Sequence, residues 1–362
     1  MLRWRSRRAR ILLAAAATLG VALVSAGCGA AQPAAERGPS QIRELNAWGG
    51  DAAAEGTPVR GGTLTMGSDR EIVSFDPTVQ NSNQAAFAVY DSLMKLTPEG
   101  TAEPYLAQSL ETTDDGTTWR MALRPEVRFS DGTPLNADAV ILNVQRHIDK
   151  VASPAHTYAE QIASMRAVDP YTVEFTLKGP LGSFPVLFGQ TLTYGGLGVI
   201  ISPAALQQYG ADIGRNPVGA GPFKLVEWIP DSRVVLERNP DYWQPNLPYL
   251  DRLEFRPLPD TESRYASIQN GDVDMIFAAY NQELVRAFAD PNLSVYYGPG
   301  NAGEYLYFNF NRAPFDDRRM REAVVRSLDM NALSAALYGG QIVTSTSLFD
   351  ASSPYHTEAA SQ

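Results

Sequence analysis

The fold is decided in a stretch that reads Asp114-Asp115-Gly116-Thr117-Thr118-Trp119 and continues to Phe129-Ser130-Asp131-Gly132-Thr133-Pro134. The Asp-Asp-Gly turn lies between residues 109–113 and 117–123, and this arrangement predicts a β-hairpin because glycine adopts the backbone conformation of tight hairpin turns. The second run predicts another tight turn. Asn136 follows it and can cap a helix over residues 137–149. This stretch therefore predicts a strand pair followed by a helix.

Strands and helices are expected on both sides of this stretch. Alternating or short apolar runs predict strands at residues 60–67, 165–168, 171–177, 199–201, 223–228, 234–238, 253–257, 272–277, 293–297 and 305–310. Helical spacing predicts helices at residues 83–94, 203–210, 261–270, 282–289, 317–328 and 331–338. Strands interspersed with helices over this length indicate an α/β protein with more than one lobe.

The charge of the chain argues against nucleic acid as the main partner. The chain has 362 residues, 30 basic, 40 acidic, and a formal net charge of −10. Five arginines lie in residues 1–27, which contain no acid, so the remainder has 25 basic residues against 40 acidic ones. An acidic body of this kind is repelled by phosphate backbones.

The N-terminus has the organisation of a lipoprotein signal peptide. Residues 1–10 are basic, residues 11–24 are apolar, and Ser25-Ala26-Gly27 precedes Cys28. The apolar run is short for a membrane span, which needs about 20 residues. We predict removal of residues 1–27 and a diacylglycerol anchor on Cys28. An ordinary cleaved signal and an uncleaved helix are the alternatives, and the choice between Sec and twin-arginine export stays open.

Cys28 is the sole cysteine, so no internal disulfide can form. Residues 28–59 are rich in Ala, Gly, Pro and Glu and predict a flexible tether.

The chain shows no catalytic pattern. His147, His156 and His356 are not spaced as metal ligands, and neither a nucleophile elbow nor a zinc-protease motif is present. Residues 298–303 match a dinucleotide-binding fingerprint, but a strand is expected after them, so a turn is favoured. Asp272 and Asp274 share one face of an expected strand, where a solvated edge is favoured over a carboxylate pair. We predict no enzyme, no cofactor and no metal, with a secreted hydrolase as a less favoured alternative.

Further motifs accompany the opening stretch in a fixed order: Gly61-Gly62-Thr63-Leu64, Ser74-Phe75-Asp76-Pro77, Tyr90-Asp91-Ser92-Leu93, Pro104-Tyr105-Leu106-Ala107-Gln108-Ser109, Asn136-Ala137-Asp138-Ala139-Val140, Gly219-Ala220-Gly221-Pro222-Phe223, Leu236-Glu237-Arg238-Asn239-Pro240-Asp241-Tyr242-Trp243, Gly271-Asp272-Val273-Asp274, Tyr307-Phe308-Asn309 and Pro314-Phe315-Asp316-Asp317. Together they resemble family 5 of the bacterial extracellular solute-binding proteins, the dipeptide/oligopeptide-binding group, across about residues 60–340.

The resemblance implies a type II periplasmic-binding-protein-like clamp with two lobes, mixed sheets and a smaller third domain. On this basis residues 60–98 and 217–297 form domain I, residues 99–216 form domain II, and residues 298–362 begin domain III. Family members continue well past Gly339-Gly340, so we expect domain III to be incomplete. A truncated reading frame is favoured over a shortened binder.

The resemblance also implies a function. The expected activity is that of an extracytoplasmic receptor that binds a small-molecule or peptide solute and delivers it to an ABC permease and ATPase complex. We expect a monomer anchored to the outer face of the cytoplasmic membrane. In peptide-binding members the segment soon after the first strand forms a wall against the ligand, and this corresponds to Gln80, Asn81, Ser82 and Asn83. The same residues suit helix capping equally well. The alternative function is a non-transporting remnant of such a receptor.

Overall fold

The computed structural model describes residues 42–44, 56–79, 84–97, 100–112, 114–189, 196–278, 281–297, 306–338 and 356–357. The chain divides into two compact units, Met1–Gly38 and Pro39–Gln362, and every described residue belongs to the second. Among the described residues, no helix combines the length and the apolar character that crossing a bilayer requires.

A four-stranded antiparallel sheet forms around the predicted hairpin. Its strands, in the spatial order β5-β6-β8-β7, are β5 (Ala107–Thr112), β6 (Thr118–Leu123), β8 (Thr172–Leu177) and β7 (Ile162–Asp169). The turn between β5 and β6 forms as expected. Oδ1 of Asp114 accepts hydrogen bonds from the backbone N of Gly116, Thr117 and Thr118 at 3.1, 2.9 and 2.9 Å. Gly116 has φ +101°, which other residues adopt only with strain.

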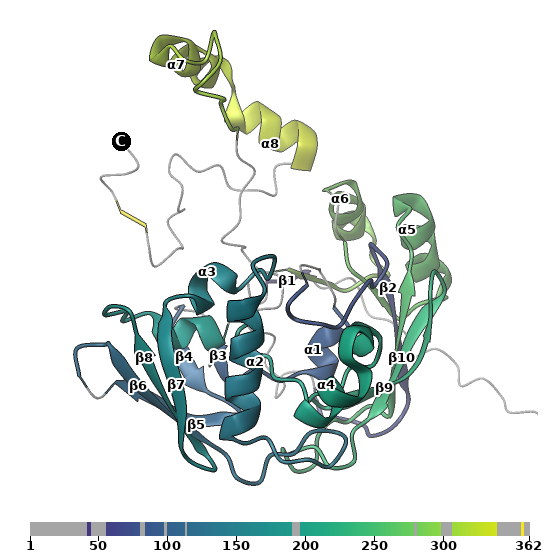
Figure 1. Ribbon diagram of the computed structural model, residues 1–362. Coiled ribbons are helices and arrows are strands. Elements are labelled where there is room, and N and C mark those ends of the chain that lie inside the picture. The colour runs from purple at the N-terminus through teal and green to yellow at the C-terminus, as the bar shows by residue number, and fades with distance from the viewer. Residues whose placement is uncertain are drawn as a thin grey trace, which may run out of the picture. The chain divides into compact units, whose positions relative to one another are not determined.

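Helix α2 (Ala137–Asp149) lies along one face of this sheet (Figure 1). The predicted cap is confirmed, because Oδ1 of Asn136 accepts a hydrogen bond from the backbone N of Ala139 at 3.0 Å. Val140 and Val144 face the core that also holds Phe175. The smaller elements of this part are β3 (Met94–Leu96), which pairs with β4 (Ala102–Pro104), α3 (His156–Ala159) and η1 (Phe184–Phe188).

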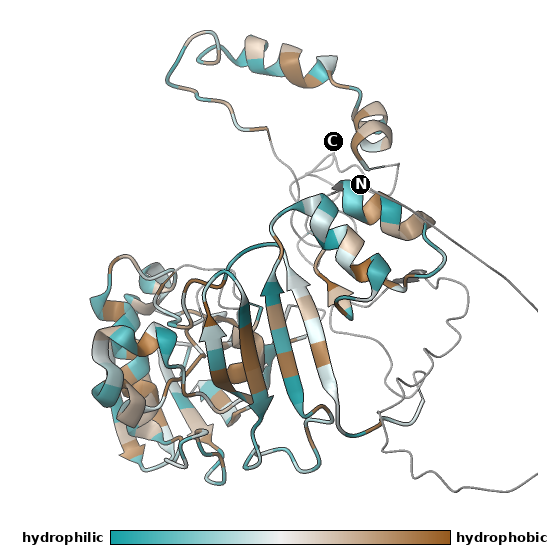
Figure 2. Cartoon of the chain, turned by 90° about the vertical axis from the view of Figure 1, so that its right-hand side faces the viewer, coloured by the Kyte–Doolittle hydropathy of each residue, from teal (hydrophilic) through white to brown (hydrophobic). Residues whose placement is uncertain are grey.

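A five-stranded mixed sheet joins distant parts of the sequence. Its spatial order is β12-β2-β11-β10-β9, with β12 (Met275–Ile276), β2 (Thr63–Ser68), β11 (Arg252–Pro257), β10 (Arg233–Arg238) and β9 (Phe223–Ile229). Strand β2 runs parallel to β11 and β12, and β10 runs antiparallel to both of its neighbours. Apolar and polar residues alternate along β2 and β11, whereas β10 buries Val234, Val235 and Leu236 in succession at a register shift; Figure 2 shows the hydropathy along the strands.

The buried face of this sheet packs against three short helices. These are α1 (Ala86–Val89), α4 (Pro203–Tyr209) and η3 (Gly210–Arg215). Val89, Ala205 and Ile213 meet Val234 and Leu236 of β10 in one apolar cluster. The start and end of α4 match the prediction, with Pro203 as its first residue and Gly210 after its last.

A third apolar cluster lies between α5 (Thr261–Asn270) and α6 (Asn281–Ala289). Strand β13 (Val295–Tyr297) follows and pairs in parallel with β1 (Ile42–Glu44), which falls inside the stretch expected to be a tether. Helices α7 (Arg318–Ser327) and α8 (Met330–Tyr338) come next. The mixed α/β class predicted from the sequence is confirmed.

Several predicted elements are shorter than expected or absent. The helix over residues 83–94 is limited to α1, because the backbone N of Leu93 bonds to the O of Gly198 at 2.9 Å and Met94 begins β3. The strand over residues 199–201 is reduced to one bridge, since the Asn143 amide binds both backbone groups of Ile201. Residues 306–310 form no strand, and only Met275–Ile276 of the predicted strand over residues 272–277 pair.

Candidate functional site

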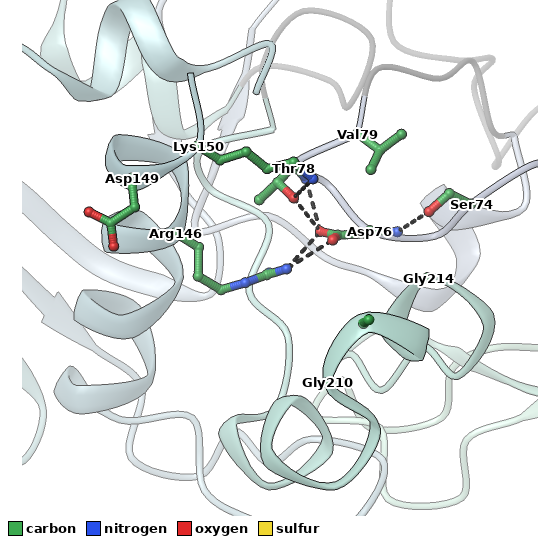
Figure 3. A pocket seen from close by; sticks show the side chains of 10 residues that line it. Ser74, Asp76, Thr78, Val79, Arg146, Asp149, Lys150, Gly210 and Gly214 are labelled. Carbon is green, nitrogen blue, oxygen red and sulfur yellow. Dashed lines mark hydrogen bonds and ion pairs between the residues drawn. The ribbon is translucent and has the colours of Figure 1, made fainter. Parts of the chain in front are cut away.

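A cavity of about 560 Å³ opens where the segment after β2 meets α2 and η3 (Figure 3). It is lined by Ser74, Asp76, Thr78, Val79, Arg146, Asp149, Lys150, Gly210, Ala211 and Gly214. The segment is fixed to η3 because the backbone N of Phe75 donates to the O of Gly214 at 2.8 Å. The backbone of Gly214 passes close to this segment, since a Cβ there would lie 2.4 Å from Oγ of Ser74 and would displace that hydroxyl.

Asp76 is the centre of the cavity's hydrogen bonds. Nη2 of Arg146 reaches across from α2 and donates to both carboxylate oxygens, at 3.0 and 2.9 Å (Figure 3). Oδ1 also accepts from the backbone N and the Oγ1 of Thr78, at 3.0 and 2.9 Å. The residue itself is 8% exposed. One buried carboxylate therefore ties the turn at residues 76–78 to α2.

The charge of Asp76 is stabilised despite its burial. Burial by itself raises the pKa of this carboxyl, but the charge of Arg146 and the hydrogen bonds from Thr78 and Arg146 outweigh it, so that the pKa lies below its ordinary value. Asp76 is therefore ionised at neutral pH and its bond to Arg146 is an ion pair.

A second cation, at the C-cap of α2, faces the same turn. Nζ of Lys150 donates to Oγ1 of Thr78 at 3.0 Å. Lys150 is the C-cap residue of α2, four residues after Arg146. The turn at residues 76–78 is thus held by Arg146 of α2 through the carboxylate of Asp76 and by Lys150, just after α2, through the hydroxyl of Thr78.

Tyr90 lies beneath this cluster. Its hydroxyl is buried and has no hydrogen-bond partner among the described residues, and the same holds for Nη1 of Arg146. Burial, followed by the charge of Asp76, raises the pKa of Tyr90 well above its ordinary value. The backbone of Gly219 passes so close that a Cβ there would lie 2.3 Å from the Tyr90 ring. This contact gives a physical reason for the glycine of the Gly219-Ala220-Gly221 motif.

The predicted ligand residues Gln80, Asn81, Ser82 and Asn83 lie outside the described residues, as does Cys28. Described residues flank the predicted wall on both sides. Val79 lines the cavity, and its backbone N donates to the O of Asp76 at 3.0 Å. On the other side, the chain from Gln84 leads into α1, where Ala86 is buried.

Sequence reasoning missed the four residues that organise the cavity, namely Asp76, Thr78, Arg146 and Lys150. Asp76 entered the sequence analysis only within the Ser74-Phe75-Asp76-Pro77 motif. Its bond to Arg146 joins residues 70 apart in the chain, which no local pattern predicts. The one usable signal was the presence of two cations four residues apart at the end of a predicted helix.

His147 is buried on α2, and Oδ2 of Asp274 accepts a hydrogen bond from the backbone N of Thr65 at 2.7 Å. Nδ1 of His147 shares a hydrogen bond of 2.7 Å with Oγ of Ser153 in the core. Burial, followed by the charge of Arg146, lowers the pKa of His147 to about 4, so the ring is neutral at physiological pH. Asp272 and Asp274 are exposed. Within the described ranges, no group of three or more His, Cys, Asp or Glu residues could hold a metal ion.

Comparison with known proteins identifies the family. Residues 101–362 match the bacterial extracellular solute-binding proteins, family 5 Middle, and the chain belongs to this family. The glutathione-binding protein GsiB of Escherichia coli K12 is 32% identical over 300 residues, which cover 81% of this chain and 56% of GsiB. The chain therefore spans about half the length of the curated relatives it matches. The resemblance inferred from the ordered motifs is confirmed.

Solved structures share the fold. The periplasmic binding protein DppA of Helicobacter pylori, in complex with the peptide STSA, superposes with a TM-score of 0.66 at 24% identity, over 81% of this chain and 61% of DppA. The substrate-binding protein CtaP of Listeria monocytogenes superposes with a TM-score of 0.66 at 26% identity, over 83% of this chain and 62% of CtaP. The periplasmic-binding-protein fold predicted for this chain is therefore confirmed.

Proposed function

We propose that this protein is the extracytoplasmic receptor of an ABC importer and that its solute is a peptide or a peptide-like small molecule. Family membership supports the class, and the relatives named for glutathione and for a bound peptide support the solute. The observation that carries the proposal is the ion pair between Asp76 and Arg146, which fixes the chain up to Val79. The residues proposed as the ligand wall, Gln80 to Asn83, come next in the sequence.

The proposed wall has the chemistry that a peptide backbone needs. Gln80, Asn81, Ser82 and Asn83 offer amide and hydroxyl groups that both donate and accept hydrogen bonds. An extended peptide binds by pairing its backbone groups with such partners. Holding the start of the wall in one conformation before the solute arrives lowers the entropy lost on binding. The ion pair of Asp76 would therefore act as a positioning element.

We propose binding without a chemical reaction. Acid–base hydrolysis by Asp76 in the cavity would need this carboxyl to exchange protons near neutral pH. Asp76 does not fit that role, because its pKa is lowered and both of its oxygens accept hydrogen bonds from Arg146. No cofactor or metal enters the proposal.

The division into domain I (60–98 and 217–297), domain II (99–216) and domain III (from 298) is part of the proposal. The five-stranded sheet supports the split domain I, because it joins β2 to strands β9 to β12 across more than 150 intervening residues. The β5-β6-β8-β7 sheet supports a separate domain II, whereas α4 and η3, at the end of the range proposed for it, pack against the five-stranded sheet. We propose a monomer that docks on a membrane permease.

A lipid anchor on Cys28 would keep this receptor on the outer face of the cytoplasmic membrane. The support is the order of basic, apolar and small residues before Cys28. We expect Cys28→Ala to release the protein from the membrane fraction of cells. Ser25→Ala is the matched control, since it keeps a small residue and should leave the protein attached. Retention of Cys28→Ala on membranes would exclude the anchor.

A thermal-shift screen of the full chain tests the solute class. At a concentration 100 times its Kd, a ligand adds about 2.7 kcal/mol of stability, or roughly 5 °C in Tm for a domain of this size. We expect such a shift with glutathione or with di- to oligopeptides, and none with matched concentrations of free amino acids or oligosaccharides. Product release from a peptide or sugar library would favour the hydrolase instead.

A further inference from the structure

A buried carboxylate joins two distant parts of the described chain, away from the cavity at Asp76. Asp91 lies between α1 and β3 and is 8% exposed. Its Oδ2 accepts hydrogen bonds from Nε1 of Trp243 and from the hydroxyl of Tyr242, both at 2.8 Å. Both donors belong to the turn at residues 239–244, which follows β10. Asp91 therefore holds that turn against the segment that begins β3.

The turn reaches from one sheet into the core of the other. It follows a strand of the five-stranded sheet, yet Trp243 packs against the apolar cluster of the four-stranded sheet. The Trp243 ring meets the Tyr105 ring edge-on, with centroids 5.3 Å apart, and the Arg124 guanidinium lies 5.2 Å from the Trp243 ring. Tyr105 and Arg124 lie beside β4, β5 and β6, so the contact joins elements of both sheets.

The hydroxyl of Tyr105 extends the hydrogen-bond chain. Nε2 of Gln244 donates to this hydroxyl at 3.1 Å, and the Tyr105 and Tyr242 hydroxyls are 3.2 Å apart. Because the Tyr242 proton is used for Asp91, Tyr105 donates to Tyr242. We call Asp91, Tyr105, Tyr242 and Trp243 the Asp91 latch.

Asp91 is the member of the latch that changes charge near neutral pH. Burial raises its pKa to about 6, although the hydrogen bonds from Trp243 and Tyr242 lower it. The pKa values of Tyr105 and Tyr242 are raised by burial and by the charge of Asp91, so both phenols stay neutral. The guanidinium of Arg124 is the other charged group that faces the Trp243 ring in this contact. The charge of the latch between pH 5 and pH 7 is therefore set by Asp91.

We propose that the Asp91 latch is a pH-dependent connection between the two sheets, which holds the turn at residues 239–244 more firmly in mild acid than at neutral pH. The closed latch keeps the Asp91 carboxyl out of water, whereas opening exposes it. An exposed carboxyl ionises at its ordinary pKa of 3.8, so opening releases a proton between that pH and about pH 6. Rising pH therefore favours opening.

The size of the pH effect on opening follows from the two pKa values of Asp91, 3.8 when exposed and about 6 when buried. The opening equilibrium rises on the order of a hundredfold from below pH 4 to well above pH 6, and it is constant outside that range. A receptor on the outside of the cell experiences the pH of its surroundings. The latch would let that pH change how firmly one sheet is coupled to the other, whatever solute the protein binds.

Hydrogen–deuterium exchange of the full chain tests the proposal. We expect exchange of amides in residues 239–247, corrected for its intrinsic pH dependence, to report an opening that rises roughly 30-fold between pH 4.5 and pH 7.5. Asp91→Asn keeps the shape of the side chain and should remove this pH dependence. Asp241→Asn, which changes an exposed carboxylate of the same turn, should keep it.

A second variant keeps the proposal testable if Asp91→Asn fails to fold. Tyr242→Phe removes one hydrogen bond that lowers the pKa of Asp91, so the midpoint of the opening curve should move to higher pH. A merely structural role for Tyr242 would raise exchange at every pH and leave the midpoint in place. An unmoved midpoint, or equal pH profiles for the wild type and Asp91→Asn, would overturn the proposal.

Discussion

Helices α2 and α7 are both amphipathic, but they differ in what covers their apolar faces. Helix α2 places Val140 and Val144 in the core of the four-stranded sheet. Helix α7 has no buried residue, and Val325 is 56% exposed. What holds α7 is local, namely the Asp317 cap and the ion pair between Arg326 and Glu322. An amphipathic pattern therefore predicts a helix in both places, whereas stability depends on the face it packs against.

Removing an aromatic ring from the core that covers α2 should give the largest loss in the free energy of unfolding. Phe175 is fully buried and packs against Phe184 and Phe188. We expect Phe175→Ala to lower the free energy of unfolding by about 3–5 kcal/mol, because it removes buried apolar surface and leaves a cavity. Val325→Ala on α7 should change it by no more than about 0.5 kcal/mol. Urea denaturation measures both, and equal losses would contradict the comparison.

Buried and exposed ion pairs extend the comparison to the third cluster. Nη2 of Arg264 is 2.6 Å from Oε2 of Glu283, and both side chains are 0% exposed. We expect Glu283→Ala to cost about 3 kcal/mol, because the Arg264 guanidinium then remains buried without that charge. Glu262→Ala removes the partner of Arg286 at an exposed pair and should cost less than about 1 kcal/mol. Thermal unfolding measures the stability of both variants. A Glu283→Ala variant as stable as the wild type would contradict this prediction.

Helix caps should give the smallest effects and distinguish the two regions. Asn136→Ala removes the cap of α2 and should lower the free energy of unfolding by about 1 kcal/mol. Asp317→Ala removes the cap of α7, where the backbone N of Arg319 is the donor. Because α7 buries nothing, this second change should increase local amide exchange without lowering the global free energy of unfolding. A global loss from Asp317→Ala as large as that from Asn136→Ala would indicate that α7 is coupled to the core.

The elements that the sequence predicted well are those with local causes. The hairpin around Gly116 depends on one carboxylate and one glycine, and α2 begins at its Asn136 cap, so both are visible in short stretches. The expected strand at residues 199–201 failed for the opposite reason. The Asn143 side chain, 58 residues away, binds the backbone groups that a neighbouring strand would have used.

The candidate site was less predictable than the fold. Its ion pair joins Asp76 to Arg146 across 70 residues, and the latch joins Asp91 to Trp243 across 152. No periodic pattern in the sequence links the two residues of either pair, so only the folded chain brings the partners together. The motif Asn239-Pro240-Asp241-Tyr242-Trp243 was recognised from the sequence as a family feature, but the hydrogen bonds of its Tyr and Trp to Asp91 were not.

Calorimetric titration of the full chain with peptides tests the central claim most directly. We expect saturable binding of glutathione or of a short peptide with a stoichiometry of one. Arg146→Gln should weaken it about tenfold, because the segment ahead of Gln80 is no longer held by an ion pair. Arg166→Gln, which breaks an exposed ion pair with Glu174 on the four-stranded sheet, should leave the affinity unchanged. Absence of binding by any peptide, or equal affinities for the wild type and Arg146→Gln, would contradict the account.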